Sequence, residues 1–122
     1  SRLNNVLSPE QLEEIFKEIG KQMALEYGIT SENLPIEKRL DKIQAVLAKE
    51  GYIASWEANK GIYRLHLLSC PYFHVGLDHP EVCQLDYALI SSFFSIPVEI
   101  KACILQGDNR CIYEIVSNLG KE

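Results

Sequence analysis

The sequence predicts an α+β fold in which two helices precede a four-stranded antiparallel sheet, with a third helix between the two hairpins of that sheet. Two observations predict this order. Up to about residue 50, apolar residues recur every three or four positions, which is the period of a helix with one buried face. From residue 52 onward, short runs rich in aromatic and β-branched residues surround turn signals, which is typical of hairpins.

The first helix is expected to begin at Ser8-Pro9-Glu10-Gln11, which combines an N-cap serine, a proline at the first helical position and a capping-box glutamine. Gly28 is its expected stop. A second helix is predicted over about 36–50, with Gly51 after it. Each helix has one apolar face, formed by Leu12, Ile15, Phe16, Ile19 and Met23 in the first and by Ile36, Leu40, Ile43 and Leu47 in the second. We expect these faces to pack in the core, and a dimer seam is the alternative for part of them.

The first hairpin is predicted to pair residues 52–57 with 62–68 across the turn Asn59-Lys60-Gly61. Residues 70–77 read as a short irregular segment. A third helix then begins at Asp78 or His79 and ends before Pro97, and its buried face is Val82, Leu85, Leu89 and Phe93.

The second hairpin is predicted to pair residues 98–105 with 111–116. A two-residue turn at Gly107-Asp108 would place Ile104 opposite Cys111. In that register Cys111 lies on the apolar face and Cys103 points to the other face. A shift of one residue would reverse this assignment.

Length and composition favour one globular domain of 122 residues with a real core. The net charge of -5 and the lack of a Lys/Arg cluster argue against a chain that grips nucleic-acid phosphates by itself. No apolar stretch approaches a membrane span and the start does not resemble a signal peptide, so we expect no membrane contact and a cytoplasmic protein. Four cysteines in such a chain read as free thiols or metal ligands.

Three of these cysteines are the best pointer to function. Cys70 follows the second predicted strand, Cys83 lies near the start of the third helix, and Cys111 opens the last strand. Thiolates suit zinc or iron–sulfur clusters, and the positive end of a helix favours the thiolate form of Cys83. The alternative is three small buried hydrophobic side chains, because the chain has no CxxC pair.

Several other residues are candidates for weaker roles. A fourth ligand could come from Cys103, His79, His74 or Asp86, although helix capping and solvent exposure are the ordinary roles of such residues. His66 reads as a half-buried sheet residue. The aromatic side chains of Tyr52, Trp56, Tyr63 and Tyr72 could line a ligand pocket or simply fill the core. We expect no enzyme, because there is no phosphate loop or G-x-S-x-G motif and no residue to orient a Cys–His pair.

Four segments of the chain resemble a known family. They are Gly51-Tyr52-Ile53-Ala54, Ser69-Cys70-Pro71-Tyr72, His79-Pro80-Glu81-Val82-Cys83 and Gly107-Asp108-x-x-Cys111-x-Tyr113-x-Ile115. In order and spacing they resemble the C-terminal sensor half of bacterial winged-helix (ArsR/DeoR-like) transcriptional regulators, the family that includes the repressor of the Suf iron–sulfur assembly operon. The resemblance covers almost the whole chain.

The resemblance implies that Cys70, Cys83 and Cys111 hold an iron–sulfur cluster, with zinc as the alternative, and it leaves the fourth ligand open. It implies a homodimer in which residues 1–50 form a helical linker and dimerisation segment and residues 51–122 form the sensor region, together one compact domain. Operator DNA would be bound only through an N-terminal winged helix that this chain lacks. The expected function is effector sensing, and the alternatives are a small-molecule-binding module with structural thiols and, less favoured, a thiol-dependent enzyme.

Overall fold

The structure is a computed structural model that describes residues 7–28 and 34–117, so the outer ends of the regions 1–50 and 51–122 lie outside the described residues. The predicted α+β class and element order are confirmed. The elements are α1 (Pro9–Glu26), α2 (Ile36–Lys49), β1 (Ile53–Asn59), β2 (Ile62–Ser69), α3 (Phe73–Asp78), the 3-10 turn η2 (Pro80–Val82), α4 (Cys83–Ser91), β3 (Val98–Ala102), the 3-10 turn η3 (Ile104–Gln106) and β4 (Cys111–Val116).

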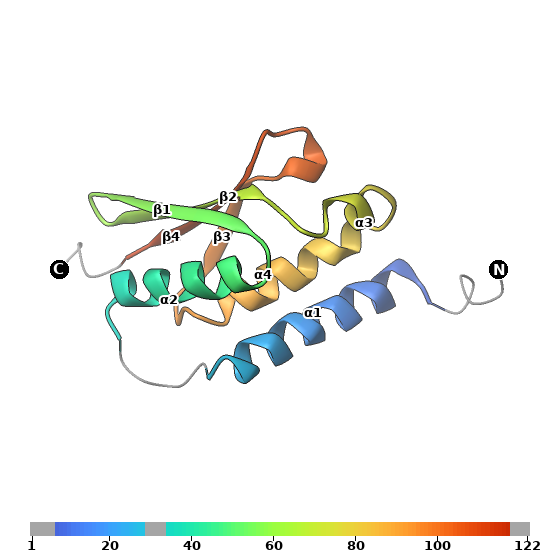
Figure 1. The fold of residues 1–122 in the computed structure, drawn as a ribbon, viewed down its shortest axis with the longest axis horizontal. Coiled ribbons are helices and arrows are strands. Elements are labelled where there is room, and N and C mark those ends of the chain that lie inside the picture. Colours follow the sequence, from blue (N-terminus) through green and yellow to red (C-terminus); the bar gives the residue numbers. More distant parts are fainter. Residues whose placement is uncertain (1–6, 29–33, 118–122) are drawn as a thin grey trace.

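The four strands form one antiparallel sheet in the order β1-β2-β4-β3, and α2 and α4 lie on the same side of it (Figure 1). Each hairpin contributes one central strand, so β2 and β4 pair with each other in the middle of the sheet. Their inward-facing side chains are opposed in the pairs Tyr63–Ile115, Leu65–Tyr113 and Leu67–Cys111. Cys111 therefore lies at one end of the pairing between the two central strands, opposite Leu67.

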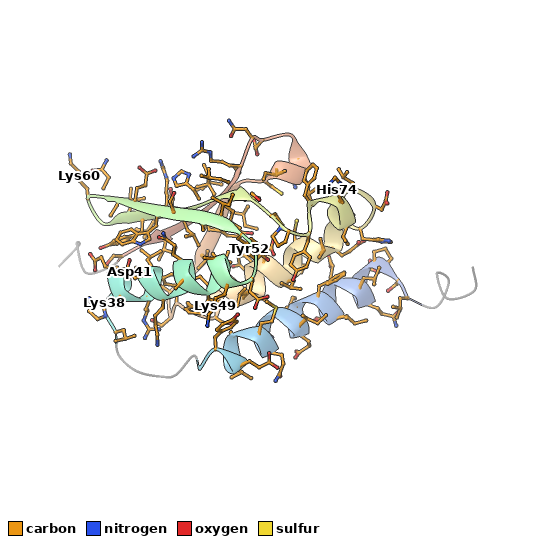
Figure 2. All side chains as sticks on the ribbon, viewed as in Figure 1. Lys38, Asp41, Lys49, Tyr52, Lys60 and His74 are labelled. Atoms are coloured by element: carbon orange, nitrogen blue, oxygen red, sulfur yellow. The ribbon has the colours of Figure 1, made fainter. Side chains whose placement is uncertain are left out.

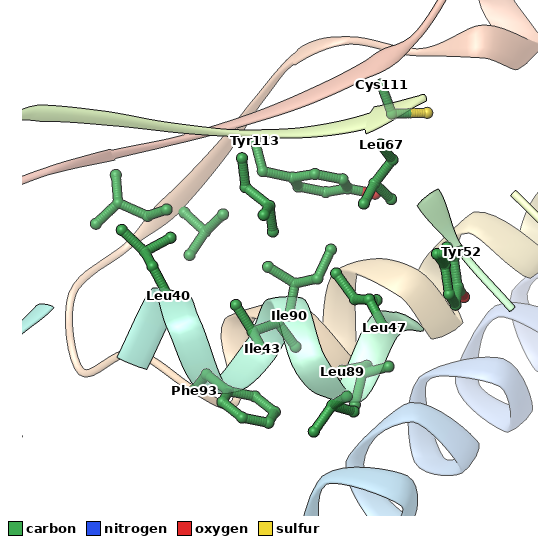
Figure 3. Close-up of a cluster of buried hydrophobic side chains, with 14 of the residues drawn as sticks. Leu40, Ile43, Leu47, Tyr52, Leu67, Leu89, Ile90, Phe93, Cys111 and Tyr113 are labelled. Carbon is green, nitrogen blue, oxygen red and sulfur yellow. The ribbon is translucent and has the colours of Figure 1, made fainter. Parts of the chain in front are cut away.

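The main hydrophobic core lies between this sheet face and the two helices (Figure 3). The predicted apolar face of α2 is confirmed, because Leu40, Ile43 and Leu47 are fully buried. From the α4 side, Leu89, Ile90 and the following Phe93 complete the packing. The core combines residues from before and after position 51, so the helical and sheet regions share one interior.

Helix α1 packs on α4, on the side away from the sheet (Figure 1). The contact is close at Gly20, where an added Cβ would lie 2.4 Å from the backbone oxygen of Leu85 and 2.9 Å from the Cβ of Ala88. The apolar face predicted for α1 is only partly used in this contact, since Ile15 and Ile19 remain 42% and 41% exposed. No helix among the described residues is long and apolar enough to cross a lipid bilayer.

Two local sequence signals have the predicted structure. The Ser8 hydroxyl accepts a hydrogen bond from the Gln11 N–H at 3.1 Å, and the Gln11 side chain accepts one from the Ser8 N–H at 2.8 Å, which completes the capping box. The first hairpin turns at Lys60-Gly61, with positive φ at both residues. This two-residue turn is the type that matches the twist of an antiparallel pair.

The helical region between the hairpins differs from the single helix that was predicted. Residues 73–78, expected to be irregular, form α3, and α4 begins only at Cys83 after η2. Between them His79 has an extended backbone, with φ -133° and ψ 77°. The residue before a proline avoids the helical region, so His79 separates α3 from η2. The expected helix therefore begins with a 3-10 turn at Pro80 and becomes α-helical at Cys83.

The second hairpin also departs from its predicted register, and the pairing of Ile104 with Cys111 is wrong. Ile100 pairs with Tyr113 and Ala102 with Ile112, so β3 carries one extra residue, Lys101, as a bulge. The connection is longer than a two-residue turn because it contains η3, and Gly107 has φ +103° at its end.

We expect Gly20→Ala to lower the free energy of unfolding by about 2 kcal/mol, because the new methyl group would overlap the backbone of α4. Chemical denaturation measures this value, and the exposed Gln22→Ala is the control, with a change within about 0.5 kcal/mol. If α1 did not dock here, Gly20→Ala would instead stabilise the helix by about 1 kcal/mol.

Candidate functional site

All four cysteines are free thiols, and they lie where β2 ends, α4 begins, β3 ends and β4 begins. We call these residues (Cys70, Cys83, Cys103 and Cys111) the thiol cluster. Cys70, Cys83 and Cys111 line one small cavity of about 10 Å³ together with Asp86. Segments that are far apart in the sequence therefore bring three thiols and one carboxylate to a single place.

Cys111 is the most buried thiol of the cluster, with 7% of its surface exposed. It is the first residue of β4, and its sulfur accepts a hydrogen bond from the Ile104 N–H at 3.4 Å. Burial raises the pKa of Cys111 to about 11, although that hydrogen bond acts in the opposite direction. The thiol is therefore protonated at neutral pH.

Cys70 follows β2 and connects the cluster to α4. Its sulfur accepts a hydrogen bond from the Tyr72 N–H at 3.4 Å, and its thiol donates to Oδ2 of Asp86 at 3.6 Å. Burial first, and then the nearby charge of Asp86, raise the pKa of Cys70 to about 12.

Asp86 is the most unusual residue of the site, since this carboxylate is only 3% exposed. It accepts hydrogen bonds from the Tyr52 hydroxyl and the Cys70 thiol, which are neutral donors. No described Lys, Arg or His forms an ion pair with it. Burial raises its pKa to about 6, against the effect of both hydrogen bonds. Buried carboxylates are normally paired with a cation, so this group lacks the partner that burial usually requires.

From the sequence, Asp86 was expected to be an exposed carboxylate on a helix. That expectation is wrong. Asp86 lies four residues after Val82 and three before Leu89, and both of these side chains are buried. It therefore occupies the inner face of the helix. That spacing was visible in the sequence, whereas its partner Tyr52 lies 34 residues away and had no such signal.

The structure places Cys103 with the other thiols, so the prediction that it points to the opposite face is wrong. The bulge at Lys101 is the reason, because it shifts the alternation by one residue. Ala102 is paired with Ile112 on the outer face, and the next residue turns toward Cys111. Cys103 is partly buried against the core and interacts with both Cys83 and Cys111.

Cys83 is the first residue of α4, as its position near a helix start predicted. We expected the helix terminus to favour its thiolate, but the pKa of Cys83 is raised. Burial is the largest cause, followed by the charges of Cys103 and Asp86. Desolvation and negative neighbours therefore outweigh the helix dipole, whose effect is typically below 1 kcal/mol at a helix end.

The histidines do not join this site. His74 and His79 are exposed and do not line the cavity, and His74 lies on α3 at the periphery of the molecule (Figure 2). His66 lies on β2, where it contacts Glu57 at 2.8 Å and Arg110 at 3.4 Å. Of the predicted fourth ligands, Asp86 lines the cavity itself and Cys103 lies beside it.

The four aromatic residues do not line a common pocket. Tyr52 and Tyr72 stack edge to face near Cys70, with ring centroids 6.2 Å apart. Trp56 and Tyr63 form a separate pair at 6.4 Å, and their polar atoms bond to Asp41 and Glu37 of α2. Only the first pair belongs to the site.

The donors suit a metal by chemical type, because thiolate sulfur with one carboxylate oxygen binds zinc or iron. Their present spacing is wider than a metal requires, since no group of three or more Cys, His, Asp or Glu within residues 7–28 and 34–117 is arranged to hold an ion. The cavity has room for about one water molecule. A bound ion would need side-chain movement, and a cluster would also need its surrounding segments to separate.

No protein-family model matches this sequence, and no curated protein is significantly similar to it.

We expect Asp86→Asn to stabilise the metal-free, reduced protein increasingly as the pH rises. The fold raises the Asp86 pKa from 3.8 to about 6, so the native state loses stability relative to the unfolded chain between these pH values. The difference in unfolding free energy between variant and wild type should grow by about 2 kcal/mol from pH 4 to pH 7. Urea unfolding with a chelator and a reductant measures it.

The matched control for this experiment is Asp78→Asn, which changes an exposed carboxylate. Its difference from the wild type should stay nearly constant over the same pH range. Parallel pH curves for wild type and Asp86→Asn would contradict the burial of an ionisable carboxylate at this position.

Proposed function

We propose that this chain is the effector-sensing domain of a transcriptional regulator and that Cys70, Cys83 and Cys111 bind an iron–sulfur cluster, with a zinc ion as the alternative. The observation that carries the proposal is the buried carboxylate of Asp86, which has only neutral hydrogen-bond partners and faces a cavity lined by the three thiols. A cation in that cavity would supply the charge that burial of Asp86 lacks.

Asp86 is the fourth donor that we favour. It lines the same cavity as the three cysteines, whereas His74 and His79 are exposed outside it. Tyr52 would orient the carboxylate through its hydrogen bond, which is the usual role of a residue behind a ligand. An iron–sulfur cluster, when bound, supplies redox chemistry and sensitivity to oxidants.

The packing of α4 gives a route from the site to α1. The first turn of α4 carries both Cys83 and Asp86, and the backbone of Leu85 between them contacts Gly20 of α1. Movement of this turn on binding or loss of a ligand would therefore displace α1. In regulators resembling this chain, the corresponding helices connect to a DNA-binding domain, so occupancy would bias two arrangements of the dimer.

We further propose that the chain forms a homodimer through α1. The exposed Ile15 and Ile19 lie beside each other on one side of the helix and leave part of its apolar face without an intramolecular contact. A two-fold interface would bury this part against the same part of a second copy.

A sensing role is favoured over a catalytic one. No histidine among the described residues hydrogen-bonds a cysteine, so a thiol-dependent enzyme would lack a base beside its nucleophile. We expect the protein in the cytoplasm, because free thiols persist in reducing compartments.

We expect the wild-type protein, reconstituted anaerobically with iron, sulfide and a reductant, to gain visible absorption and to retain iron and sulfide after desalting. If the protein retains zinc, but not iron and sulfide, after the same anaerobic procedure with a zinc salt, the zinc-ion alternative is supported. Cys70→Ser, Cys83→Ser and Cys111→Ser should each reduce metal retention at least about tenfold, because each removes a direct ligand. Elemental analysis and absorption spectra measure both effects.

His74→Ala and His79→Ala are the controls and should retain metal like the wild type, because both residues lie outside the cavity lining. Far-UV circular dichroism establishes that each variant is folded. If the wild type retains no metal, or the folded cysteine variants retain it equally, the metal proposal fails. Metal-independent binding of a small molecule would then support the binding-module alternative.

Light scattering at micromolar concentration should give twice the 13.9 kDa chain mass for the wild type. Ile15→Glu combined with Ile19→Glu should shift the protein to a monomer, since charges in a two-fold apolar contact face each other. Lys21→Glu is the control, because Lys21 lies on the other side of α1. A monomeric wild type would contradict the proposed dimer.

A further inference from the structure

A groove of about 410 Å³ on the surface reaches two members of the thiol cluster. Cys83 and Cys103 line it, together with Lys101 and Asp108, whereas Cys70 and Cys111 do not. The groove is therefore separate from the small cavity, although both have Cys83 in their walls. A small dissolved reagent that enters the groove meets Cys83 and Cys103 first.

These two cysteines are also side-chain neighbours, and both are held by their backbones. The Cys83 and Cys103 side chains interact with each other, and both line the groove. The Cys103 N–H donates to Oδ2 of Asp108 at 2.8 Å, and its carbonyl accepts the N–H groups of Gln106 and Asp108. Cys83 is fixed as the first residue of α4. The pair is thus preorganised from two elements that are distant in the sequence.

We propose that Cys83 and Cys103 form an intramolecular disulfide when a two-electron oxidant such as hydrogen peroxide enters this groove. Nothing in the sequence pattern suggested this pair, since the predicted register placed Cys103 on the opposite face of the sheet. The bulge at Lys101 is what brings the two thiols together.

The reaction takes two steps. In the first, the Cys103 thiol loses its proton, its sulfur attacks one peroxide oxygen, and the O–O bond breaks. Hydroxide leaves and takes up that proton as water, and Cys103 becomes a sulfenic acid. In the second, the Cys83 sulfur attacks the sulfenic sulfur, the S–S bond forms, and hydroxide leaves and takes up the thiol proton as water. Two thiols and one peroxide give one disulfide and two waters. Cys103 is assigned the first attack because it lines only the groove, whereas Cys83 also lines the inner cavity.

Cys83 lines both the groove and the cavity, so the disulfide would affect metal binding. This effect rests on the proposed function. A Cys83 sulfur bonded to Cys103 cannot also bind a metal in the cavity. Oxidation and metal binding would therefore exclude each other, and peroxide would block reloading of the site after the metal is lost. The disulfide itself requires no metal, so it can be tested independently.

The test uses the metal-free, reduced chain, treated with a small molar excess of hydrogen peroxide and then alkylated and digested without reductant. Mass spectrometry should identify a Cys83–Cys103 linked peptide pair as the main product, with Cys70 and Cys111 alkylated. A main product that links Cys103 to Cys111, an intermolecular disulfide, or oxidation only to sulfinic and sulfonic acids would overturn the proposal.

Variants identify the order of the steps and control for folding. Cys83→Ser should leave a sulfenic acid on Cys103 that dimedone traps, whereas Cys70→Ser should form the disulfide like the wild type. Equal dimedone labelling of Cys70 or Cys111 in Cys83→Ser would contradict the selectivity of the groove. If the wild type forms the disulfide but retains no metal, only the metal proposal fails. If it retains metal but forms no such disulfide, only this inference fails.

Discussion

The site depends on one interaction, the burial of the Asp86 carboxylate against the Tyr52 hydroxyl and the Cys70 thiol. These three residues come from α4, from the residue before β1, and from the residue after β2. Hydrogen bonds to a charged group contribute about 1.5 to 3 kcal/mol each, but they do not fully offset the desolvation of a buried charge. The carboxylate therefore holds three segments together while it remains poorly compensated, and a cation beside it would lower the free energy of the native state.

The first turn of α4 carries Cys83 and Asp86, and its two sides contact different parts of the structure. One face presents Asp86 and Cys83 to the cavity, and the other meets α1 at Gly20, beside the backbone of Leu85 and the Cβ of Ala88. Neither Gly20 nor Ala88 has a side chain that can rotate, so in the proposed mechanism a displacement of this turn would be passed on to α1. In the proposed dimer, the exposed Ile15 and Ile19 of α1 form the interface, so such a displacement would change the arrangement of the two copies.

Much of the fold could be predicted because it follows from local rules. The Ser8 capping box, the buried face of α2 and the Lys60-Gly61 turn each depend on residues within one or two turns of the chain. The helix that follows His79 was expected, but its first turn is the 3-10 turn η2, and α3 before it was not predicted. The environment of Cys103 could not be predicted, since a bulge leaves the alternation of strand residues unchanged in the sequence while it changes the face each residue occupies.

The convergence of Cys70, Cys83 and Cys111 on one cavity was expected from the strand pattern and the family resemblance, whereas the role of Asp86 required the structure. Native mass spectrometry of the anaerobically reconstituted chain tests the central claim most directly, because the mass added to each chain identifies the bound group. The account predicts one iron–sulfur cluster or one zinc ion per chain, lost in Cys83→Ser and weakened in Asp86→Ala. A folded wild-type chain that carries no added mass, or one that keeps the same adduct in both variants, would contradict it.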